Sequence, residues 1–337
     1  MKNRGYDYPD SVDRADAGLT VLAFYARRYR HSSQAEWRDK IVRGEVTLNG
    51  RVAVPDGQLS AGDLLIYHRP AWDEPEAPTR FGVLFEDDDL LVLDKPSGLP
   101  VLPGGFFLET TLLYQVRRRF GPSCSPLHRL GRGTSGAILF TRNRDAARLL
   151  AKAMFERRIT KIYLALASGT SMPDAFTIDA PIGPVPHTLP ETLNAYRPDG
   201  RPSTSHVRVL KRFLERNASL VEVTIPTGRP HQIRIHLAYA GFPLVGDPLY
   251  LPGGVPRADG LDDEWSTTPG ATGYLLHSWK IGFPHPTRGE RVEVICPPPA
   301  ELEPDLSGPA TRSGSGDLDR SRGQFGFLKR SRHSLAR

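Results

Sequence analysis

One glycine-rich segment of the chain has the spacing of a phosphate-binding turn. Residues 131–136 read G-R-G-T-S-G, which fits the G-x-G-x-x-G pattern of dinucleotide-binding proteins. That pattern needs a buried strand before it and a helix after it. Here residues 137–141 (A-I-L-F-T) resemble a strand after the last glycine, whereas residues 127–130 (L-H-R-L) make a poor buried strand before the first. Because the order is reversed, the sequence argues against a nucleotide cofactor.

Side chains that could bind a metal ion are sparse and wrongly spaced. His231 and His236 are five positions apart, so they do not form the i, i+4 pair of a helical zinc site. Cys124 and Cys296 lie far apart in the sequence with no second pair, which implies neither a zinc site nor a disulfide framework. We therefore expect no metal, no cofactor and two reduced cysteines.

Positive charge gathers beside the glycine-rich segment. Residues 128–161 hold nine Lys and Arg against Asp145 and Glu156, although the net charge of all 337 residues is only +6. A basic surface of this kind is expected where a phosphate backbone docks, and a helix with a solvated basic face is the alternative. Charge alone leaves both possibilities open.

The glycine-rich segment is part of a longer motif. Residues 128–136 read H-R-L-G-R-G-T-S-G and resemble H-R-L-D-x-x-T-S-G, the signature loop of RluA-type RNA pseudouridine synthases, whose Asp is the catalytic carboxylate. Four further segments resemble other motifs of this family and occur in the family's order: residues 85–100, 158–169, 227–250 and 276–286. The resemblance implies the family's fold and its reaction, the isomerisation of uridine to pseudouridine in structured RNA without a cofactor.

Three positions correspond to catalytic residues of the family, and one of them has lost its functional group. Tyr163 matches a Tyr that packs against the flipped base, with a buried structural tyrosine as the alternative, and Arg234 matches the Arg that normally pairs with the Asp. Gly131 stands at the position of the Asp itself. Glycine offers neither charge nor lone pair, and loss of a central catalytic group commonly lowers a rate by several orders of magnitude.

The missing carboxylate matters because breaking the bond from the ribose to uracil builds positive charge on the sugar. A nearby carboxylate captures the anomeric carbon, stabilises the charge or removes a sugar proton. Asp247 and Asp94 border the family's site and could substitute, but each has a structural alternative, as a turn former and as a loop ion pair. Two hypotheses follow: a divergent enzyme that retains isomerase activity, and a catalytically silent RNA-binding protein or RNA chaperone on the same scaffold.

A paired uracil cannot rotate within a helix, so the nucleotide must leave the stack. The resemblance implies that Arg129 fills the gap with its planar guanidinium, and an ordinary phosphate contact is the alternative. We expect further RNA contacts at Arg132 and in the N-terminal region, where salt-bridged helices are the alternative. The expected partner is ribosomal or transfer RNA. The N-terminal residues concerned are Arg27, Arg28, Arg38, Lys40 and Arg43.

The secondary structure that must position these residues can be predicted from apolar patterns. Hairpin-joined strands interspersed with helices indicate an α+β fold with a mixed, largely antiparallel central sheet. Strands are predicted at residues 82–86, 90–93, 137–141, 161–167, 205–213 and 219–225, and helices at 110–119, 144–157 and 231–240.

Four regions follow from composition and motifs. Residues 1–70 resemble the S-four fold, a small α/β RNA-binding module, with two helical stretches and a hairpin at Asn49-Gly50. Residues 71–79, rich in Pro and acidic side chains, are predicted to be a linker, and residues 80–302 the catalytic domain. Residues 303–337 have few apolar side chains, which predicts a disordered basic tail.

The bulk composition is that of an ordinary globular protein, with 39% hydrophobic and 24% charged residues. No stretch approaches the roughly 18 apolar residues of a membrane helix, and the first residues lack the apolar core of a signal peptide. We expect a cytoplasmic monomer that makes no contact with a membrane.

Deletion of residues 303–337 tests the predicted tail. Residues 311–337 carry seven Lys and Arg against Asp317 and Asp319. Because phosphate contacts release counterions, we expect weaker RNA binding and a shallower dependence of affinity on salt, with an unchanged unfolding temperature. RNA titrations at several salt concentrations and thermal melting measure these effects. A truncated protein with the same affinity and salt dependence would contradict the prediction.

Overall fold

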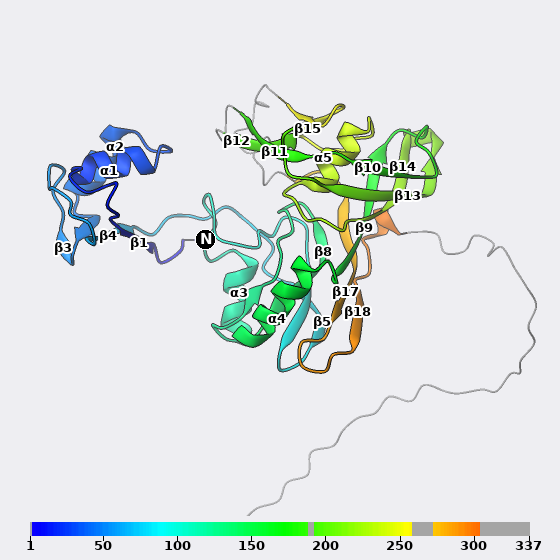
Figure 1. The fold of residues 1–337 in the computed structure, drawn as a ribbon, viewed down its shortest axis with the longest axis horizontal. Helices are drawn as coiled ribbons and strands as arrows, with labels where there is room; N and C mark the ends of the chain where they lie inside the picture. The colour runs from blue at the N-terminus through cyan, green and yellow to red at the C-terminus, as the bar shows by residue number, and fades with distance from the viewer. Residues whose placement is uncertain (1, 188–191, 258–271, 304–337) are drawn as a thin grey trace, which may run out of the picture. The chain divides into compact units, whose positions relative to one another are not determined.

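The computed structural model describes residues 2–187, 192–257 and 272–303 (Figure 1). Residues 304–337 of the predicted tail therefore lie outside the described residues. The predicted α+β fold with its mixed central sheet is confirmed.

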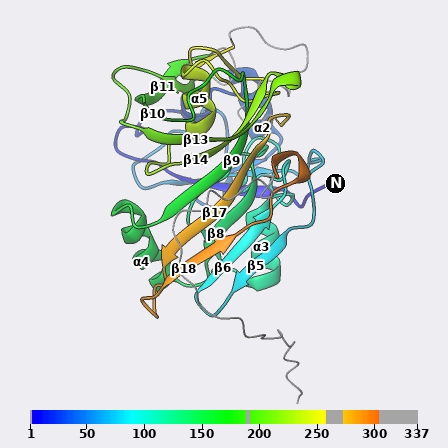
Figure 2. The same ribbon diagram turned by 90° about the vertical axis from the view of Figure 1, so that its right-hand side faces the viewer.

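A ten-stranded mixed sheet forms the centre of the main domain (Figure 2). Its strands follow the order β10-β13-β14-β9-β17-β8-β6-β5, with β18 beside β17 and β7 beside β8. Among these described strands the pairing is antiparallel except between β17 and β8. The strands are β5 (Gly82–Glu86), β6 (Leu90–Lys95), β7 (Ser125–Pro126), β8 (Ser135–Thr141), β9 (Thr160–Ser168), β10 (Ala175–Asp179), β13 (Thr204–Phe213), β14 (Ala218–Thr224), β17 (Leu276–Pro284) and β18 (Arg291–Ile295).

The parallel contact between β17 and β8 requires a glycine. Gly136 has φ +104° and lies opposite Ser278, and a Cβ on Gly136 would come within 2.7 Å of the Ser278 backbone nitrogen. Only glycine adopts this conformation without strain and leaves room for the neighbouring backbone. The last glycine of the signature loop therefore allows β8 and β17 to lie side by side at this point.

Helices cover both faces of the sheet. α3 (Leu112–Phe120) packs Leu112 and Val116 against one face, where Leu91 and Leu93 of β6 point. α4 (Arg144–Phe155) packs Ala146, Leu150 and Ala153 against the other face, with Leu90 and Val92. Alternate residues of one strand thus point to opposite layers, as the period of two in a strand dictates. Each fully buried aliphatic side chain contributes roughly 1.5–3 kcal/mol to these layers.

The third helix, α5 (Gln232–Tyr239), is buried on nearly all sides. Ile233 and Leu237 join the main core, whereas Ile235 and Ala238 pack against two small sheets. One of these sheets pairs β11 (Ile182–Pro186) with β12 (Thr192–Tyr196), and the other pairs β15 (Tyr250–Leu251) with β16 (Val255–Pro256). The described part of the main domain also has two short 3-10 turns, η1 (Leu214–Arg216) and η2 (Ala300–Leu302). No helix of the described residues is long and apolar enough to cross a membrane.

The N-terminal region has its own core beneath two helices. Trp37, Tyr25 and Ile41 are buried there with Val46 and Leu65 of its four-stranded sheet. Asn49 and Gly50 both have positive φ, so they form the predicted hairpin turn. The predicted helices and hairpin are present, and the S-four assignment stays a prediction. The elements are β1 (Tyr6–Ser11), α1 (Val21–Arg28), α2 (Gln34–Val42), β2 (Val46–Leu48), β3 (Arg51–Val52) and β4 (Leu64–Arg69).

A buried carboxylate anchors the segment predicted to be a linker. Glu74 is 5% exposed and accepts hydrogen bonds from the backbone N–H groups of Leu108, Glu109 and Thr110 at 2.8–2.9 Å, and from the amide of Asn3 at 2.9 Å. Burial raises the pKa of Glu74, but these hydrogen bonds outweigh it and lower the pKa to about 2. The segment is therefore fixed at Glu74, and the domain boundaries stay a prediction.

The substitution Glu74→Gln should destabilise the protein in a pH-dependent way. A carboxylate whose pKa falls from 4.5 to about 2 on folding stabilises the folded state above pH 4.5, and this stabilisation is lost as the pH falls toward 2. We expect the variant to lose about 2–3 kcal/mol of unfolding free energy at neutral pH, with a smaller difference in acid. Urea denaturation of both proteins at neutral and at acidic pH measures this difference in unfolding free energy. The exposed Glu76→Gln is the matched control, and equal behaviour of the two variants would refute the anchoring role.

Candidate active site

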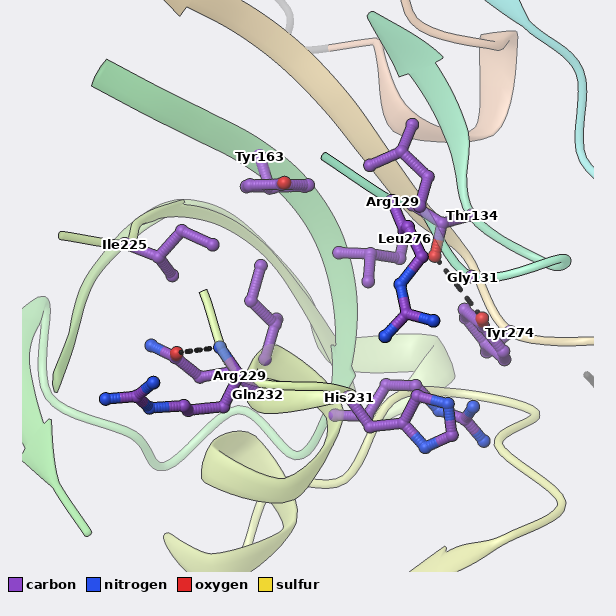
Figure 3. Close-up of a pocket in the computed structure, with 13 residues that line it drawn as sticks. Arg129, Gly131, Thr134, Tyr163, Ile225, Arg229, His231, Gln232, Tyr274 and Leu276 are labelled. Atoms are coloured by element: carbon purple, nitrogen blue, oxygen red, sulfur yellow. Dashed lines mark hydrogen bonds between the residues drawn. The ribbon is translucent and has the colours of Figure 1, made fainter. Parts of the chain in front are cut away.

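A pocket opens beside the signature loop, and the three predicted catalytic positions line it together. Gly131 and Tyr163 line it with Arg129 and Tyr274 (Figure 3), and Arg234 is also among the lining residues. Its empty volume is ≈ 440 Å³, which includes part of the open mouth. Segments far apart in the sequence thus converge as the resemblance implied, and the roles of their residues stay predictions.

Position 131 suits glycine because there is little room for a side chain, and not because the backbone requires glycine. Gly131 lacks a positive φ, and its carbonyl accepts a hydrogen bond from the Thr134 N–H at 3.0 Å. A Cβ at this position would lie 3.0 Å from the hydroxyl oxygen of Tyr274 and 3.4 Å from the Thr134 Oγ1. A larger residue would therefore crowd the Tyr274 phenol, which glycine accommodates.

The loop that follows β6 braces the signature loop. The ammonium group of Lys95 is fully buried and donates to the carbonyls of Pro96 and Leu99, both at 2.8 Å, and of Arg132 at 3.1 Å. Burial, and then the nearby charge of Arg132, lower the pKa of Lys95 to about 7. The Ser97 hydroxyl also donates to the Gly133 carbonyl at 2.9 Å. The Lys-Pro-x-Gly motif thus holds the backbone on which residue 131 sits.

Tyr163 contributes a phenol from the central strand β9. Its side chain is 6% exposed and faces the pocket across from the Gly131 loop and Tyr274 (Figure 3). Burial raises the pKa of Tyr163 to about 12, although a hydrogen bond with Ser278 acts in the opposite direction. Tyr163 is therefore a neutral phenol near pH 7, which can pack against a base or donate a hydrogen bond.

Arg234 forms a bidentate ion pair with Asp247. Its Nε and Nη2 donate to the two carboxylate oxygens at 2.7 and 2.6 Å, and both side chains are 1% exposed. Burial would lower the pKa of Arg234, but the hydrogen bonds to Asp247 raise it above the ordinary value. Asp247 also accepts the backbone N–H groups of Leu249 and Tyr250. Asp247 therefore makes the contacts expected of a turn former, the alternative that the sequence offered, and Asp94 is not among the residues that line the pocket.

The two arginines of the signature loop, Arg129 and Arg132, differ in their exposure and in their contacts with the protein. Arg129 is exposed and lines the pocket. Arg132 donates from Nε to the Gly98 carbonyl at 3.1 Å, and its guanidinium lies 4.9 Å from the centroid of the Phe107 ring. Arg132 thus contacts other residues of the protein and holds the loop in place. RNA contacts of either arginine stay predictions.

Most of the predicted RNA-binding cations in the N-terminal region contact other side chains of that region. Lys40 donates to the Ser32 hydroxyl at 3.0 Å and lies 4.2 Å from the centroid of the Trp37 ring. Arg38 is exposed. Three arginines have acidic partners, in the pairs Arg27–Asp16, Arg28–Asp10 and Arg43–Glu45. These contacts favour salt-bridged helices for those three residues, and RNA binding by this region remains a prediction.

Sequence reasoning missed Tyr274 as a residue of the site. Tyr274 lies two positions before the closing strand β17, next to Gly273, and is 3% exposed. Its hydroxyl lies 3.3 Å from the Thr134 Oγ1, and the Arg234 guanidinium lies 4.2 Å from its ring centroid. Its position beside the 276–286 motif was the available signal, but the contact with Gly131 depends on the folded chain.

One group of side chains has the spacing of metal ligands but lies away from the pocket. Ligand atoms of Asp87, Asp89 and His285 lie within 4.8 Å of one another. His285 already contacts Asp87 at 2.7 Å, and Arg288 donates to the same carboxylate at 2.8 Å. These contacts tie the β5–β6 turn to the end of β17, and the pocket receives no ligand from this group.

The substitution Asp247→Ala tests the buried ion pair. Removal of the carboxylate leaves the Arg234 charge buried without compensation, so we expect a loss of about 3–5 kcal/mol in unfolding free energy. Chemical denaturation measures this loss. The exposed pair of Arg197 and Asp199 gives the control Asp199→Ala, which should leave the unfolding free energy almost unchanged. Similar losses in the two variants would show that burial of the pair is unimportant.

Comparison with known proteins finds RNA pseudouridine synthases by sequence and by structure. A family model described as RNA pseudouridylate synthase matches residues 89–239. The chain is 41% identical to an uncharacterized RNA pseudouridine synthase of Synechocystis, with 84% of this chain and 95% of that protein covered. It is 38% identical to RNA pseudouridine synthase 5 of Arabidopsis thaliana, with 89% and 95% covered, and 33% identical to ribosomal large subunit pseudouridine synthase D of Xanthomonas campestris, with 88% and 89% covered. The solved structure of human RNA pseudouridylate synthase domain containing 1 matches at a TM-score of 0.51 and 28% identity, over 68% of this chain and 89% of that chain. The chain therefore belongs to the RluA-type family of RNA pseudouridine synthases.

Proposed function

We propose that this protein isomerises uridine to pseudouridine in structured RNA, with ribosomal RNA as the substrate class, although position 131 is glycine. The observation that carries the proposal is the preserved pocket, in which Tyr163, Arg234 and Arg129 surround one cavity. The relative named for the ribosomal large subunit supports the choice of RNA.

The pocket has the surfaces that a flipped uridine needs. Leu276 and Ile225 give it apolar walls, and Tyr163 offers an aromatic face. A planar base can stack there and turn about the axis that brings carbon 5 toward the sugar. Arg129 is exposed and lines the pocket, and in this proposal its planar guanidinium enters the gap that the nucleotide leaves in the RNA stack.

A catalytically silent RNA-binding protein is the second candidate. The observation that favours it is that the residues lining the described pocket include neither Asp nor Glu. Asp247, the nearest substitute in sequence terms, is held by Arg234 and by two backbone N–H groups. Among the described residues that line the pocket, activity would therefore depend on a group other than a carboxylate.

Release of tritium from carbon 5 of uracil distinguishes the two candidates. Ribosomal RNA transcribed with 5-tritiated uridine, and transfer RNA transcripts in a separate reaction, serve as substrates. We expect the wild-type protein to release label from ribosomal RNA, and Tyr163→Phe to release it roughly a hundredfold more slowly because it lacks the phenol that can donate a hydrogen bond to the departing uracil. The exposed Tyr239→Phe is the matched control and should match the wild type.

A filter-binding measurement with the same RNAs completes the test. Wild-type protein that binds RNA but releases no label from either substrate would contradict the proposed reaction and favour the silent RNA-binding protein. Release from transfer RNA alone would contradict the substrate class and leave the reaction standing.

A further inference from the structure

We propose that Tyr274 supplies the nucleophilic oxygen that position 131 lacks, an inference that rests on the proposed function. Its phenol is placed beside Gly131, inside the pocket that holds Tyr163 and Arg234. The protein would then be a synthase in which a phenol has taken the place of a carboxylate.

The position of the Tyr274 oxygen is the first support. It lies 3.0 Å from the point where a Cβ of residue 131 would stand. A carboxylate on that Cβ would occupy the same region of the pocket, so the phenol oxygen reaches the volume from which a side chain at 131 would act. Thr134 holds the hydroxyl at 3.3 Å from its Oγ1. The oxygen is thus directed by the signature loop although it comes from another part of the chain.

Elimination is the second support. The described residues that line the pocket include two oxygen acids, Tyr163 and Tyr274, and no carboxylate. Tyr163 is buried in β9 and hydrogen bonded with Ser278. His231 directs its Nδ1 to the hydroxyl of Tyr250 at 2.9 Å. The described lining places two oxygens beside Gly131, the Tyr274 hydroxyl and the Thr134 Oγ1, and the phenol is the far stronger acid of the two.

The third support is the charge that faces the Tyr274 ring. The Arg234 guanidinium lies 4.2 Å from the ring centroid, in the geometry of a cation–π contact. Its Nε and Nη2 hold Asp247, and its Nη1 is buried without a hydrogen-bond partner among the described residues. A fixed positive charge in a water-poor site stabilises a phenolate more than a neutral phenol. Arg234, already paired with Asp247, therefore faces the ring of Tyr274, on whose oxygen negative charge would develop.

The turn before Asp247 fixes the Tyr274 backbone. Gly246 has φ +74°, and a Cβ on Gly246 would collide with the carbonyl oxygen of Gly273. The backbone that leads into Tyr274 thus packs directly on the turn whose next residue holds Arg234. One turn therefore positions both the phenol and the cation beside it.

The proposed reaction has two displacements at the anomeric carbon. In the first, the Tyr274 oxygen bonds to this carbon as the bond to uracil nitrogen 1 breaks; the uracil keeps both electrons and takes the phenolic proton. The base then rotates. In the second, uracil carbon 5 bonds to the anomeric carbon, the electrons of the carbon–oxygen bond return to Tyr274, and the phenolate takes the proton that carbon 5 releases.

This sequence leaves the enzyme unchanged and needs no other reactant. Each displacement inverts the anomeric carbon, so two of them retain its configuration, as in glycosidases that use a covalent intermediate. A tyrosine nucleophile has precedent in sialidases, which also act on an anomeric carbon.

The variant Tyr274→Phe tests the proposal, because phenylalanine keeps the ring beside Arg234 and removes one oxygen. With tritiated ribosomal RNA as the probe, we expect release of label to fall at least roughly a thousandfold. RNA affinity and unfolding temperature should stay as in the wild type, since the packing is retained. Tyr114→Phe, in α3 and outside the pocket, is the matched control.

Two further measurements separate a catalytic from a structural role. Gly131→Ala places a Cβ against the Tyr274 oxygen, so it should lower the rate while RNA affinity is unchanged. A wild-type reaction quenched in acid during turnover should contain a covalent RNA adduct on the peptide that carries Tyr274, detectable by mass spectrometry.

The outcomes distinguish this inference from the proposed function. If the wild type releases label and Tyr274→Phe releases it at the same rate, or if quenched reactions contain no adduct at Tyr274, the inference is overturned and the synthase activity stands. If the wild type releases no label, the proposed function fails and the inference fails with it. Loss of label release in Tyr274→Phe at unchanged affinity, together with the adduct, establishes the proposal.

Discussion

The buried ion pair between Arg234 and Asp247 is the interaction on which the pocket depends. Two charges that are each 1% exposed carry a desolvation cost of several kcal/mol per ion, which only short bidentate contacts and further hydrogen bonds can offset. The pair meets both conditions, because Asp247 also accepts two backbone N–H groups. It joins α5 to the Gly246-Asp247 turn and so fixes one wall of the pocket.

This pairing explains how the scaffold tolerates glycine at position 131. An arginine whose sole partner had been lost would be a buried uncompensated charge, which is strongly destabilising. Here Asp247 compensates the charge from the turn, so folding does not require an acid on the signature loop. The loop in turn keeps its shape through the hydrogen bonds of Lys95 and Ser97, which contact its backbone and are independent of the side chain at 131.

Sequence reasoning succeeded where a pattern is local and failed where the structure depends on distant contacts. The predicted strand at residues 82–86 matches β5, and the predicted helix at 144–157 overlaps α4 closely. Both predictions rest on apolar patterns formed by residues that are close together in the sequence. β1 was missed because five of its six residues are exposed and it contains Pro9, so it shows no apolar alternation. The motif positions of the site could be named from the sequence, whereas Tyr274 enters the pocket only when β17 lies beside β8 and β9.

The relation between Gly131 and Tyr274 bears on whether the site has decayed. Simple loss of an acid would leave a vacant volume and an arginine facing it. In this structure the phenol of Tyr274 lies at the edge of that volume, a Cβ at 131 would crowd it, and Arg234 faces its ring. Glycine at 131 and tyrosine at 274 are therefore sterically complementary. This complementarity, in a pocket that also contains Arg234, supports the proposal that a phenol has replaced the carboxylate.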